Sequence, residues 1–344
     1  MKKVLLRVDF NVPLENGKIA DDFRIRVCLP TIKSLLKKGH QIFLITHLEV
    51  DGKTPHLDLV HKALGKLLGI KIGLVWGKLP PRPQNFSERV VLFDNIRLNA
   101  GEKANNLAFA KQLAAWGDYY INEAFAASHR THASIVLLPK FLPHHAGSLF
   151  KSEVRELSKF FKPKHPFLFV LGGKKFETKE PLISRFLKNA DAIFVGGALG
   201  NTFLAGRNVD VKKSKIEKAR ISQHIISSPK ILLPEDWVME SGKIYDAGPK
   251  TIEMLSGLAQ KAKFILWNGT LGLCEKGFDK GTRDFAKALG KSGAYRVVGG
   301  GDTVAAIRKM KLEKNFDFVS TGGGAMLEFL AKGTLPGIEA LKTR

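Results

Sequence analysis

The sequence predicts an α/β protein in which two parallel sheets, each flanked by helices, are joined by a single helix. Short apolar runs alternate with amphipathic helical patterns along the chain, and the order strand, helix, strand implies parallel pairing. The strand ends of the first half are rich in Arg and His, whereas those of the second half are rich in Gly. Between the halves, the apolar residues of 146–161 recur at three- and four-residue steps, which predicts the connecting helix.

Composition restricts the class of protein and of ligand. A chain of 344 residues is long enough for two cores, and its net charge of +23 attracts phosphorylated metabolites, nucleotides, nucleic acid or acidic membranes. The two cysteines, Cys28 and Cys274, suggest neither a disulfide framework nor a metal-ligand spacing. The apolar N-terminal stretch is interrupted by Arg7 and Asp9, so it predicts a strand and not a signal peptide, and no apolar run approaches the length of a membrane helix. We therefore expect a cytoplasmic protein without a membrane partner.

The first half is expected to build one parallel sheet from alternating strands and helices. Its predicted strands are 3–9, 41–46, 90–95 and 118–125. Its predicted helices are 23–39, 57–69 and 107–117. The first helix is expected to be continuous between Asp22 as N-cap and Gly39 as C-cap.

Polar residues follow these predicted strands at equivalent positions. They are Asp9, Asn11, His47, Arg97, His129 and Arg130, with Arg24 in the first turn of the first helix. One such arginine is usually a surface ion-pair partner, but several at the carboxyl ends of parallel strands meet at one edge of a sheet, where ligands bind. The planar guanidinium suits phosphate and carboxylate oxygens. The sequence therefore predicts a site for a small polyanion.

The second half repeats the pattern of a strand, a glycine cluster and a helix. The repeats are 166–187, 191–204, 295–307 and 318–330, and 264–275 is a strand and loop that ends in Glu275. Glycines let the backbone approach a phosphate, and a following helix offers N–H groups and a positive dipole end. Lys175 and Lys179 add charge, while Asp302 is a candidate hard-cation ligand as well as a candidate N-cap. Neither a Walker A loop nor a dinucleotide fingerprint is present, so we expect a nucleotide site of another kind.

Taken in order, the motifs RVDFNVP, FRIR, ASHRTH, LGGxK, WNG, GGGD and TGGGA resemble those of the phosphoglycerate kinase family. The resemblance extends from RVDFNVP near the start to LEFLAKGTLPGIEAL near the end. It implies two Rossmann-like domains with parallel sheets flanked by helices, joined by an interdomain helix. The implied parts are a phosphoglycerate-binding domain (1–145), the interdomain helix (146–161), a nucleotide-binding domain (162–330) and a C-terminal segment that returns to the first domain (331–344).

The resemblance also implies roles for individual residues. The implied substrate-binding residues are Asp9, Phe10, Asn11, Arg24, His47, Arg97 and Arg130. The implied nucleotide-binding residues are Gly172, Gly173, Lys175, Lys179, Gly196, Gly197, Asn268, Glu275, Gly300, Gly301, Asp302 and Thr303. Catalysis would fall to Arg24, Lys175 and Gly301, and Asp302 would hold Mg²⁺ through the nucleotide.

The implied reaction is reversible Mg²⁺-dependent phosphoryl transfer between 1,3-bisphosphoglycerate and ADP, giving 3-phosphoglycerate and ATP, in glycolysis and gluconeogenesis. Its nucleophile is already an ionised oxygen, so the site needs positioning and charge neutralisation and no general base. Arg24 and Lys175 would have to meet on the phosphoryl group, which implies a hinge-bending closure of the domains. The family also implies a monomer.

The sequence departs from the family at several places. Glu49 and Val50 stand where the family has a glycine and a substrate-binding arginine, so one phosphate contact is lost and an acid is added. Other departures are Glu123, Ala126, Lys174, Ala198, Thr270, Cys274 and Met326. Two alternatives follow: a kinase of this fold with a different anionic carboxylate acceptor, and a nucleotide- or nucleic-acid-binding protein with low activity. The absence of a recognition motif argues against a specific nucleic-acid partner.

Overall fold

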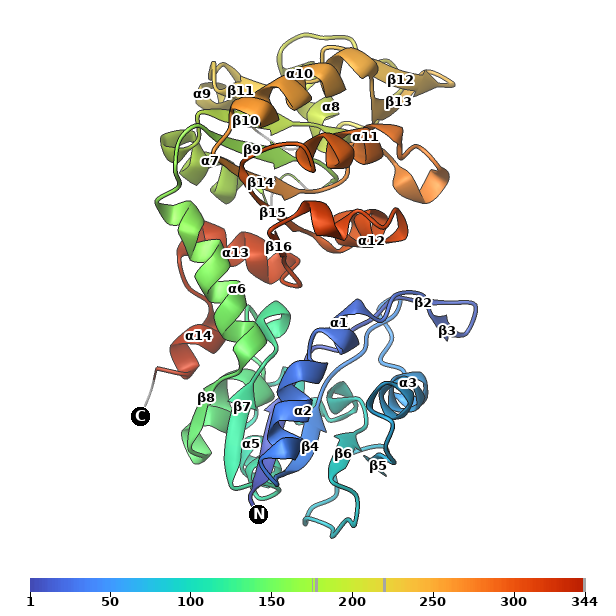
Figure 1. Cartoon of the computed structure of the whole chain (residues 1–344), viewed down its shortest axis with the longest axis vertical. Coiled ribbons are helices and arrows are strands. Elements are labelled where there is room, and N and C mark those ends of the chain that lie inside the picture. The colour runs from blue at the N-terminus through green and yellow to red at the C-terminus, as the bar shows by residue number, and fades with distance from the viewer. Residues whose placement is uncertain (175, 177–178, 219–220, 343–344) are drawn as a thin grey trace. The chain divides into compact units, whose positions relative to one another are not determined.

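The computed structural model describes residues 1–174, 176, 179–218 and 221–342, which form two compact units (Figure 1). Unit 1 comprises Met1–Arg155 and Thr334–Arg344, and unit 2 comprises Glu156–Gly333. Each unit contains a six-stranded sheet, and every strand pair in these two sheets is parallel. The predicted α/β fold with two Rossmann-like sheets is therefore confirmed.

The sheet of unit 1 has its first strand in the interior of the sheet, beside a topological switch point. Its order is β5 (Gly73–Val75), β6 (Val90–Phe93), β4 (Gln41–Ile45), β1 (Lys3–Arg7), β7 (Tyr119–Asn122) and β8 (His144–Ala146). The central strands are buried on both faces, as is usual for parallel sheets covered by helices. Because the chain continues from β1 to β4 on one side and reaches β7 on the other, the loops after these strands border a topological switch point.

The helices of unit 1 differ from the predicted ones at two places. The expected continuous helix over 23–39 is wrong, because α1 (Phe23–Arg26) and α2 (Leu29–Lys37) are separate. Pro30 explains the break, since proline has no N–H for the carbonyl four residues back and its ring collides with that carbonyl. The connecting helix begins later than its pattern predicts, because Ala146 pairs with β7 as the last residue of β8.

The remaining elements of unit 1 follow. They are β2 (Leu14–Glu15), β3 (Lys18–Ile19), α3 (Asp58–Leu68), α4 (Ala100–Lys103), α5 (Leu107–Ala114) and α14 (Pro336–Ala340). The connecting helix is α6 (Ser148–Ser158), followed by a 3-10 turn over Lys159–Phe161. The boundary between the two units falls inside α6, between Arg155 and Glu156.

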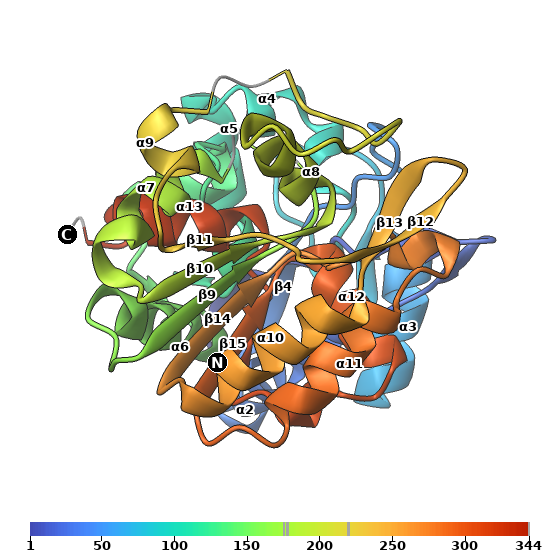
Figure 2. The same ribbon diagram turned by 90° about the horizontal axis from the view of Figure 1, so that it is seen from above.

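The sheet of unit 2 has the doubly wound strand order. Its order is β11 (Ile231–Leu232), β10 (Ala192–Val195), β9 (Phe167–Leu171), β14 (Phe264–Asn268), β15 (Tyr295–Gly299) and β16 (Phe318–Val319). Figure 2 shows the first five of these strands side by side. In chain order this is 3-2-1-4-5-6, so the switch point lies between β9 and β14. Leu171 and Asn268, the last residues of these two strands, are in register.

Three helices of unit 2 begin at the predicted glycine clusters, namely α8 (Gly197–Gly206), α12 (Gly301–Lys309) and α13 (Gly324–Lys332). The other helices of this unit are α7 (Glu180–Asn189), α9 (Gln223–Ile226), α10 (Pro249–Lys261) and α11 (Lys280–Leu289). A hairpin of β12 (Trp237–Glu240) and β13 (Lys243–Ala247) precedes α10. In the part of the chain that the structure describes, no helix has both the length and the apolarity that crossing a bilayer requires.

Candidate active site

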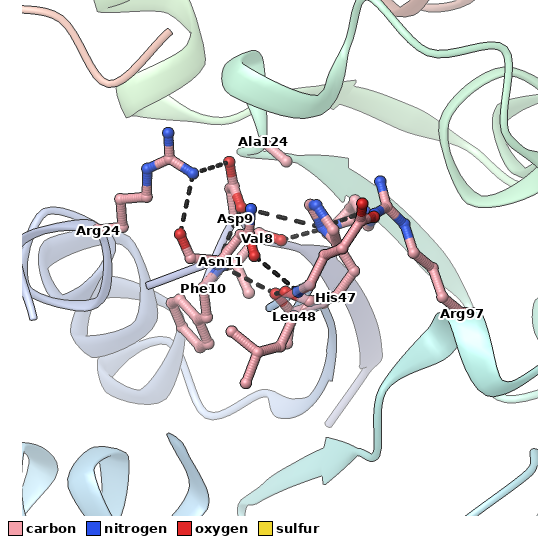
Figure 3. Close-up of polar contacts among 12 residues, drawn as sticks. Val8, Asp9, Phe10, Asn11, Arg24, His47, Leu48, Arg97 and Ala124 are labelled. Carbon is pink, nitrogen blue, oxygen red and sulfur yellow. Dashed lines mark hydrogen bonds and ion pairs between the residues drawn. The ribbon is translucent and has the colours of Figure 1, made fainter. Parts of the chain in front are cut away.

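Asp9 and Arg24 form one side of the candidate site in unit 1 (Figure 3). The guanidinium of Arg24 donates to a carboxylate oxygen of Asp9 at 3.1 Å and to the backbone carbonyl of Asn11 at 3.0 Å. The other carboxylate oxygen of Asp9 accepts the N–H of Asn11 at 3.0 Å. Burial alone would raise the pKa of Asp9, but the positive charge of Arg24 lowers it below its ordinary value. Asp9 is therefore ionised at neutral pH and holds Arg24 at the end of β1.

His47 lies two residues beyond the end of β4 and is a neutral hydrogen-bond donor in this site. Burial lowers its pKa well below 6.5, and the nearby positive charges of Arg7 and Arg97 lower it further. Its Nδ1 lies 3.3 Å from an Nη atom of Arg7. Because a guanidinium can only donate, Nδ1 accepts this bond, and the ring proton is on Nε2. The imidazole thus offers an N–H to a ligand without carrying a charge.

Arg7 is a member of this site that sequence reasoning missed. It lies in β1 and is almost completely buried, where it donates to Ser134 Oγ at 2.9 Å and to the carbonyl of Val8. Ser134 Oγ in turn donates to the buried carboxylate of Glu102 at 2.6 Å. Burial raises the pKa of Glu102 although Arg7 opposes this. The sequence signal for Arg7 is a charged residue inside an otherwise apolar strand, which argues against a signal peptide but does not by itself indicate a site.

Arg97 and Arg130 extend the cluster on the other side of His47. Arg97 lies on the 3-10 turn that follows β6, and its guanidinium pairs with the carboxylate of Glu49. Burial lowers the pKa of Arg97, which the charge of Glu49 opposes. Arg130 is exposed, and its positive charge also lowers the pKa of Arg97. Unit 1 therefore gathers guanidinium groups from four segments around the carboxyl ends of its central strands.

Phe10 is also among the predicted substrate residues, but its side chain lies in the core of unit 1. Its N–H donates to Thr46 Oγ1 at 2.9 Å, and its carbonyl accepts the N–H of Val12 at 2.9 Å. Phe10 therefore fixes the loop that presents Asp9 and Asn11, and its own polar groups are already used.

A pocket of about 570 Å³ lies at the carboxyl ends of the strands in unit 2. Of the predicted nucleotide-binding residues, those that line it are Gly173, Lys179, Gly197, Asn268, Glu275, Gly300, Gly301, Asp302 and Thr303. Gly172 and Gly196 lie outside the described lining. Lys175, predicted to be catalytic, lies outside the described residues. The pocket sits at the switch point between β9 and β14, where the doubly wound order places a ligand.

Close approach of two strand ends requires glycine at position 172, beside this pocket. The N–H of Gly172 donates to the carbonyl of Asn268 at 2.8 Å, so the loops after β9 and β14 touch. A β-carbon on Gly172 would lie 2.1 Å from the carbonyl oxygen of Thr270. At the start of α12, Gly300 has a φ of 95°, which L side chains rarely adopt. The N–H of Gly269 donates to Thr303 Oγ1 at 2.9 Å, which ties α12 to the same loop.

Lys179 is the buried cation of the pocket. Its ammonium donates to the carbonyls of Gly172 and, at 2.8 Å, of Lys174. Burial lowers the pKa of Lys179 to about 8, and the charges of Glu217 and Asp302 oppose this shift. The Nζ atom of Lys174 lies 3.7 Å from a carboxylate oxygen of Glu275. The pocket thus combines helix N-termini with lysine charge, which suits a phosphorylated ligand.

Asp246 is the principal lining residue that the sequence did not reveal. It is the penultimate residue of β13. Its carboxylate accepts the N–H of Gly281 at 2.8 Å and that of Ala247 at 2.9 Å. Burial raises its pKa to about 6. No glycine cluster follows this short strand, so local sequence carries no signal that it borders a ligand site.

Asp302 is the carboxylate in this pocket that suits Mg²⁺. It stands in the first turn of α12. Among the described residues, no group of three or more His, Cys, Asp and Glu side chains could hold a metal ion without a ligand. Mg²⁺ bound with a nucleotide needs one or two carboxylates besides the phosphates and water. The donor set therefore fits a metal that arrives with the nucleotide.

Comparisons with known proteins all point to one family. The family model described as phosphoglycerate kinase matches residues 1–333. The phosphoglycerate kinases of Dictyoglomus turgidum and Rubrobacter xylanophilus are 38% and 39% identical, and each alignment covers 100% of this chain and 96% of the relative. Two solved phosphoglycerate kinases, from Coxiella burnetii (33% identity, TM-score 0.81) and Pyrococcus horikoshii (28%, 0.90), are aligned over 99% of this chain and 96% of theirs.

Proposed function

Because the chain belongs to the phosphoglycerate kinase family, we propose that it transfers a phosphoryl group between 1,3-bisphosphoglycerate and ADP, giving 3-phosphoglycerate and ATP. The enzyme is a phosphotransferase with a carboxyl group as acceptor. The observation that carries the proposal is a pair of candidate sites: the strand ends at the switch point of one sheet are rich in arginine, and those of the other border a pocket built from glycine loops.

In unit 1, the arginine cluster would bind 3-phosphoglycerate. Arg24 and Arg97 would contact its anionic groups from two sides, and Arg130 would add charge from the exposed side. His47 would donate its Nε2–H, since Nδ1 is taken by Arg7. Asp9 and Asn11 support this role because they hold Arg24 in place.

In unit 2, the pocket would bind the nucleotide with its phosphates at the glycine-rich N-termini of α8, α12 and α13. Lys179 would supply positive charge, and Glu275 would meet the ribose. Mg²⁺ held by Asp302 and the phosphates would neutralise charge on the transferred group. Gly301 would donate its backbone N–H to that group.

The chemistry asks for cations and no general base, because the attacking oxygen is already ionised. Arg24 from unit 1, with Lys175 and Gly301 from unit 2, would stabilise the transferred group. Transfer between substrates held by two units requires them to meet, so we propose hinge bending at α6, where the unit boundary falls. We further propose a cytoplasmic, monomeric enzyme that acts on small molecules, without a nucleic-acid partner.

A coupled assay tests the proposal. The purified protein should form ATP from 1,3-bisphosphoglycerate and ADP when Mg²⁺ is present. Arg24→Ala should abolish most of this turnover, whereas Arg26→Ala, a matched change at an exposed arginine paired with Asp22, should leave it intact. A wild-type rate no higher than that of a Lys175→Ala variant would exclude the proposed activity.

A further inference from the structure

Arg97 is a buried cation whose counter-ion lies toward solvent. The side chain of Arg97 is only 6% exposed, whereas that of its partner Glu49 is 39% exposed. Removing a guanidinium from water is unfavourable unless an opposite charge and hydrogen bonds compensate. Glu49 supplies that charge in the ligand-free protein. Since its carboxylate sits on the accessible side of the pair, an anion from solvent can take its place.

The backbone fixes Glu49 at the entrance of the site. Its N–H donates to the side-chain oxygen of Asn11 at 2.8 Å. The next residue, Val50, exchanges two backbone hydrogen bonds with Lys53, at 3.0 and 2.9 Å, which closes a tight turn. The backbone of Glu49 is thus anchored at the base of a short hairpin, two residues after His47, while its side chain is partly exposed.

The other arginines of the cluster are held differently. Arg24 pairs with Asp9, whose side chain is itself buried, and that carboxylate cannot leave without losing several other contacts. Arg7 is buried against Ser134. Among the arginine contacts described for this site, the pair of Arg97 with Glu49 is therefore the one that a ligand can exchange.

We propose that Glu49 is an internal competitor for the acceptor site: its carboxylate occupies Arg97 until an anionic acceptor displaces it. The inference rests on the proposed function of the arginine cluster and adds a determinant of its affinity. Every anion that uses Arg97 must first break the Glu49 pair and then tolerate the displaced negative charge nearby. Glu49 therefore weakens acceptor binding without touching the nucleotide pocket of unit 2.

Direct binding to the full-length protein tests this without relying on catalysis. Calorimetry would measure the dissociation constants of 3-phosphoglycerate and of inorganic phosphate for the wild type, Glu49→Gln and Glu88→Gln. Glu88 pairs with Lys71 at 2.8 Å elsewhere in unit 1, so its variant makes the same change in net charge. We expect E49Q to bind both anions roughly threefold to tenfold more tightly, and E88Q to bind them as the wild type does.

A double-mutant cycle locates the effect. In an Arg97→Met background, E49Q should give no further gain, because the guanidinium for which it competes has gone. Unchanged or weaker binding by E49Q would overturn the proposal, as would an equal gain in E88Q or in the R97M background. If R97M does not fold, the comparison of E49Q with E88Q decides alone. If E49Q binds anions more tightly but the protein makes no ATP, the competitor role of Glu49 stands and the proposed kinase activity is rejected. If the protein makes ATP but E49Q binds anions no more tightly, the kinase activity stands and the competitor role is rejected.

Discussion

The carboxylate of Glu123, one residue beyond β7, accepts a hydrogen bond from the backbone N–H of Leu149 in the first turn of α6, at 3.1 Å. It also accepts the N–H of Phe150 at 3.2 Å and the hydroxyl of Thr31. The first N–H groups of a helix have no partner within the helix, so this buried carboxylate caps α6 from a strand distant in sequence. The side chain of Glu123 thus fixes the start of α6 from the end of β7.

Removing this cap should destabilise the protein. Glu123→Ala leaves buried N–H groups without an acceptor, and we expect a loss of about 1–3 kcal/mol in the free energy of unfolding. Urea denaturation measures it. Glu328→Ala, at a surface ion pair with Lys332, should change stability by less than about 0.5 kcal/mol. Equal stability of the two variants would show that the capping contacts contribute nothing.

Nucleotide binding near pH 8 should take up protons. Burial lowers the pKa of Lys179 to about 8 from its ordinary 10.5, and nearby phosphates should raise it again. At pH 8 we expect an uptake of roughly half a proton per nucleotide bound, measured by calorimetry in buffers of different ionisation enthalpy. Lys179→Arg remains charged and should abolish the uptake. The same uptake in this variant would assign the proton to another group.

The lowered pKa of Lys179 also predicts how the stability of the folded protein depends on pH. Between about pH 8 and 10.5 the unfolded chain keeps the Lys179 proton while the folded protein has lost it. The unfolded state then binds more protons, so this lysine makes stability rise with pH across that window. Wild type should gain stability relative to Lys179→Met as pH increases from 8 to 10. A constant difference between them would contradict the lowered pKa.

Restoring an arginine at Val50 should strengthen acceptor binding. The resemblance to the family implies an arginine where Val50 stands, and the side chain of Val50 packs against the core of unit 1. Val50→Arg should therefore lower the KM for 3-phosphoglycerate while reducing stability by about 1 kcal/mol through lost packing. Steady-state kinetics and urea denaturation measure the two effects. A KM that stays the same or rises would mean that the hairpin at Val50 has been rebuilt in another way.

Glycine should be required at position 172. A β-carbon there would lie 2.1 Å from the carbonyl oxygen of Thr270, so Gly172→Ala must push apart the loops after β9 and β14. We expect a loss of about 1–3 kcal/mol in stability and weaker nucleotide binding. Gly257, inside α10 with open space around it, is the matched control, and Gly257→Ala should stabilise by up to about 1 kcal/mol. Full nucleotide affinity in Gly172→Ala would refute the close-approach argument.

Local patterns predicted the elements of this fold well, because strand, glycine and helix signals are encoded by neighbouring residues. The helices α8, α12 and α13 start at glycine clusters as expected. The break between α1 and α2 is also encoded, at Pro30, because the missing N–H outweighs the apolar periodicity of 23–39. The edge strands β5 and β8 were missed because each has three residues and no distinct boundary signal.

The sequence predicted which residues belong to the candidate site, but not the residues with which they pair. Arg24, His47 and Arg97 were expected to meet because strand ends share an edge, and the structure brings them together. Their partners could not be predicted in the same way. Arg7 reaches Ser134 across 127 positions, and Arg97 reaches Glu49 across 48. Such pairs depend on the packing of distant segments, to which local periodicity is blind.

Unit 1 is completed by residues that follow all of unit 2 in the chain. The N–H of Gly337, in α14, donates to the carbonyl of Ser128 at 2.9 Å, and the adjoining Leu335 is fully buried. A ribosome therefore synthesises the whole of unit 2 before it delivers the segment that covers Ser128. The first unit to leave the exit tunnel is the last to be finished, and until then the nascent chain exposes the apolar surface of unit 1 against which Leu341 packs.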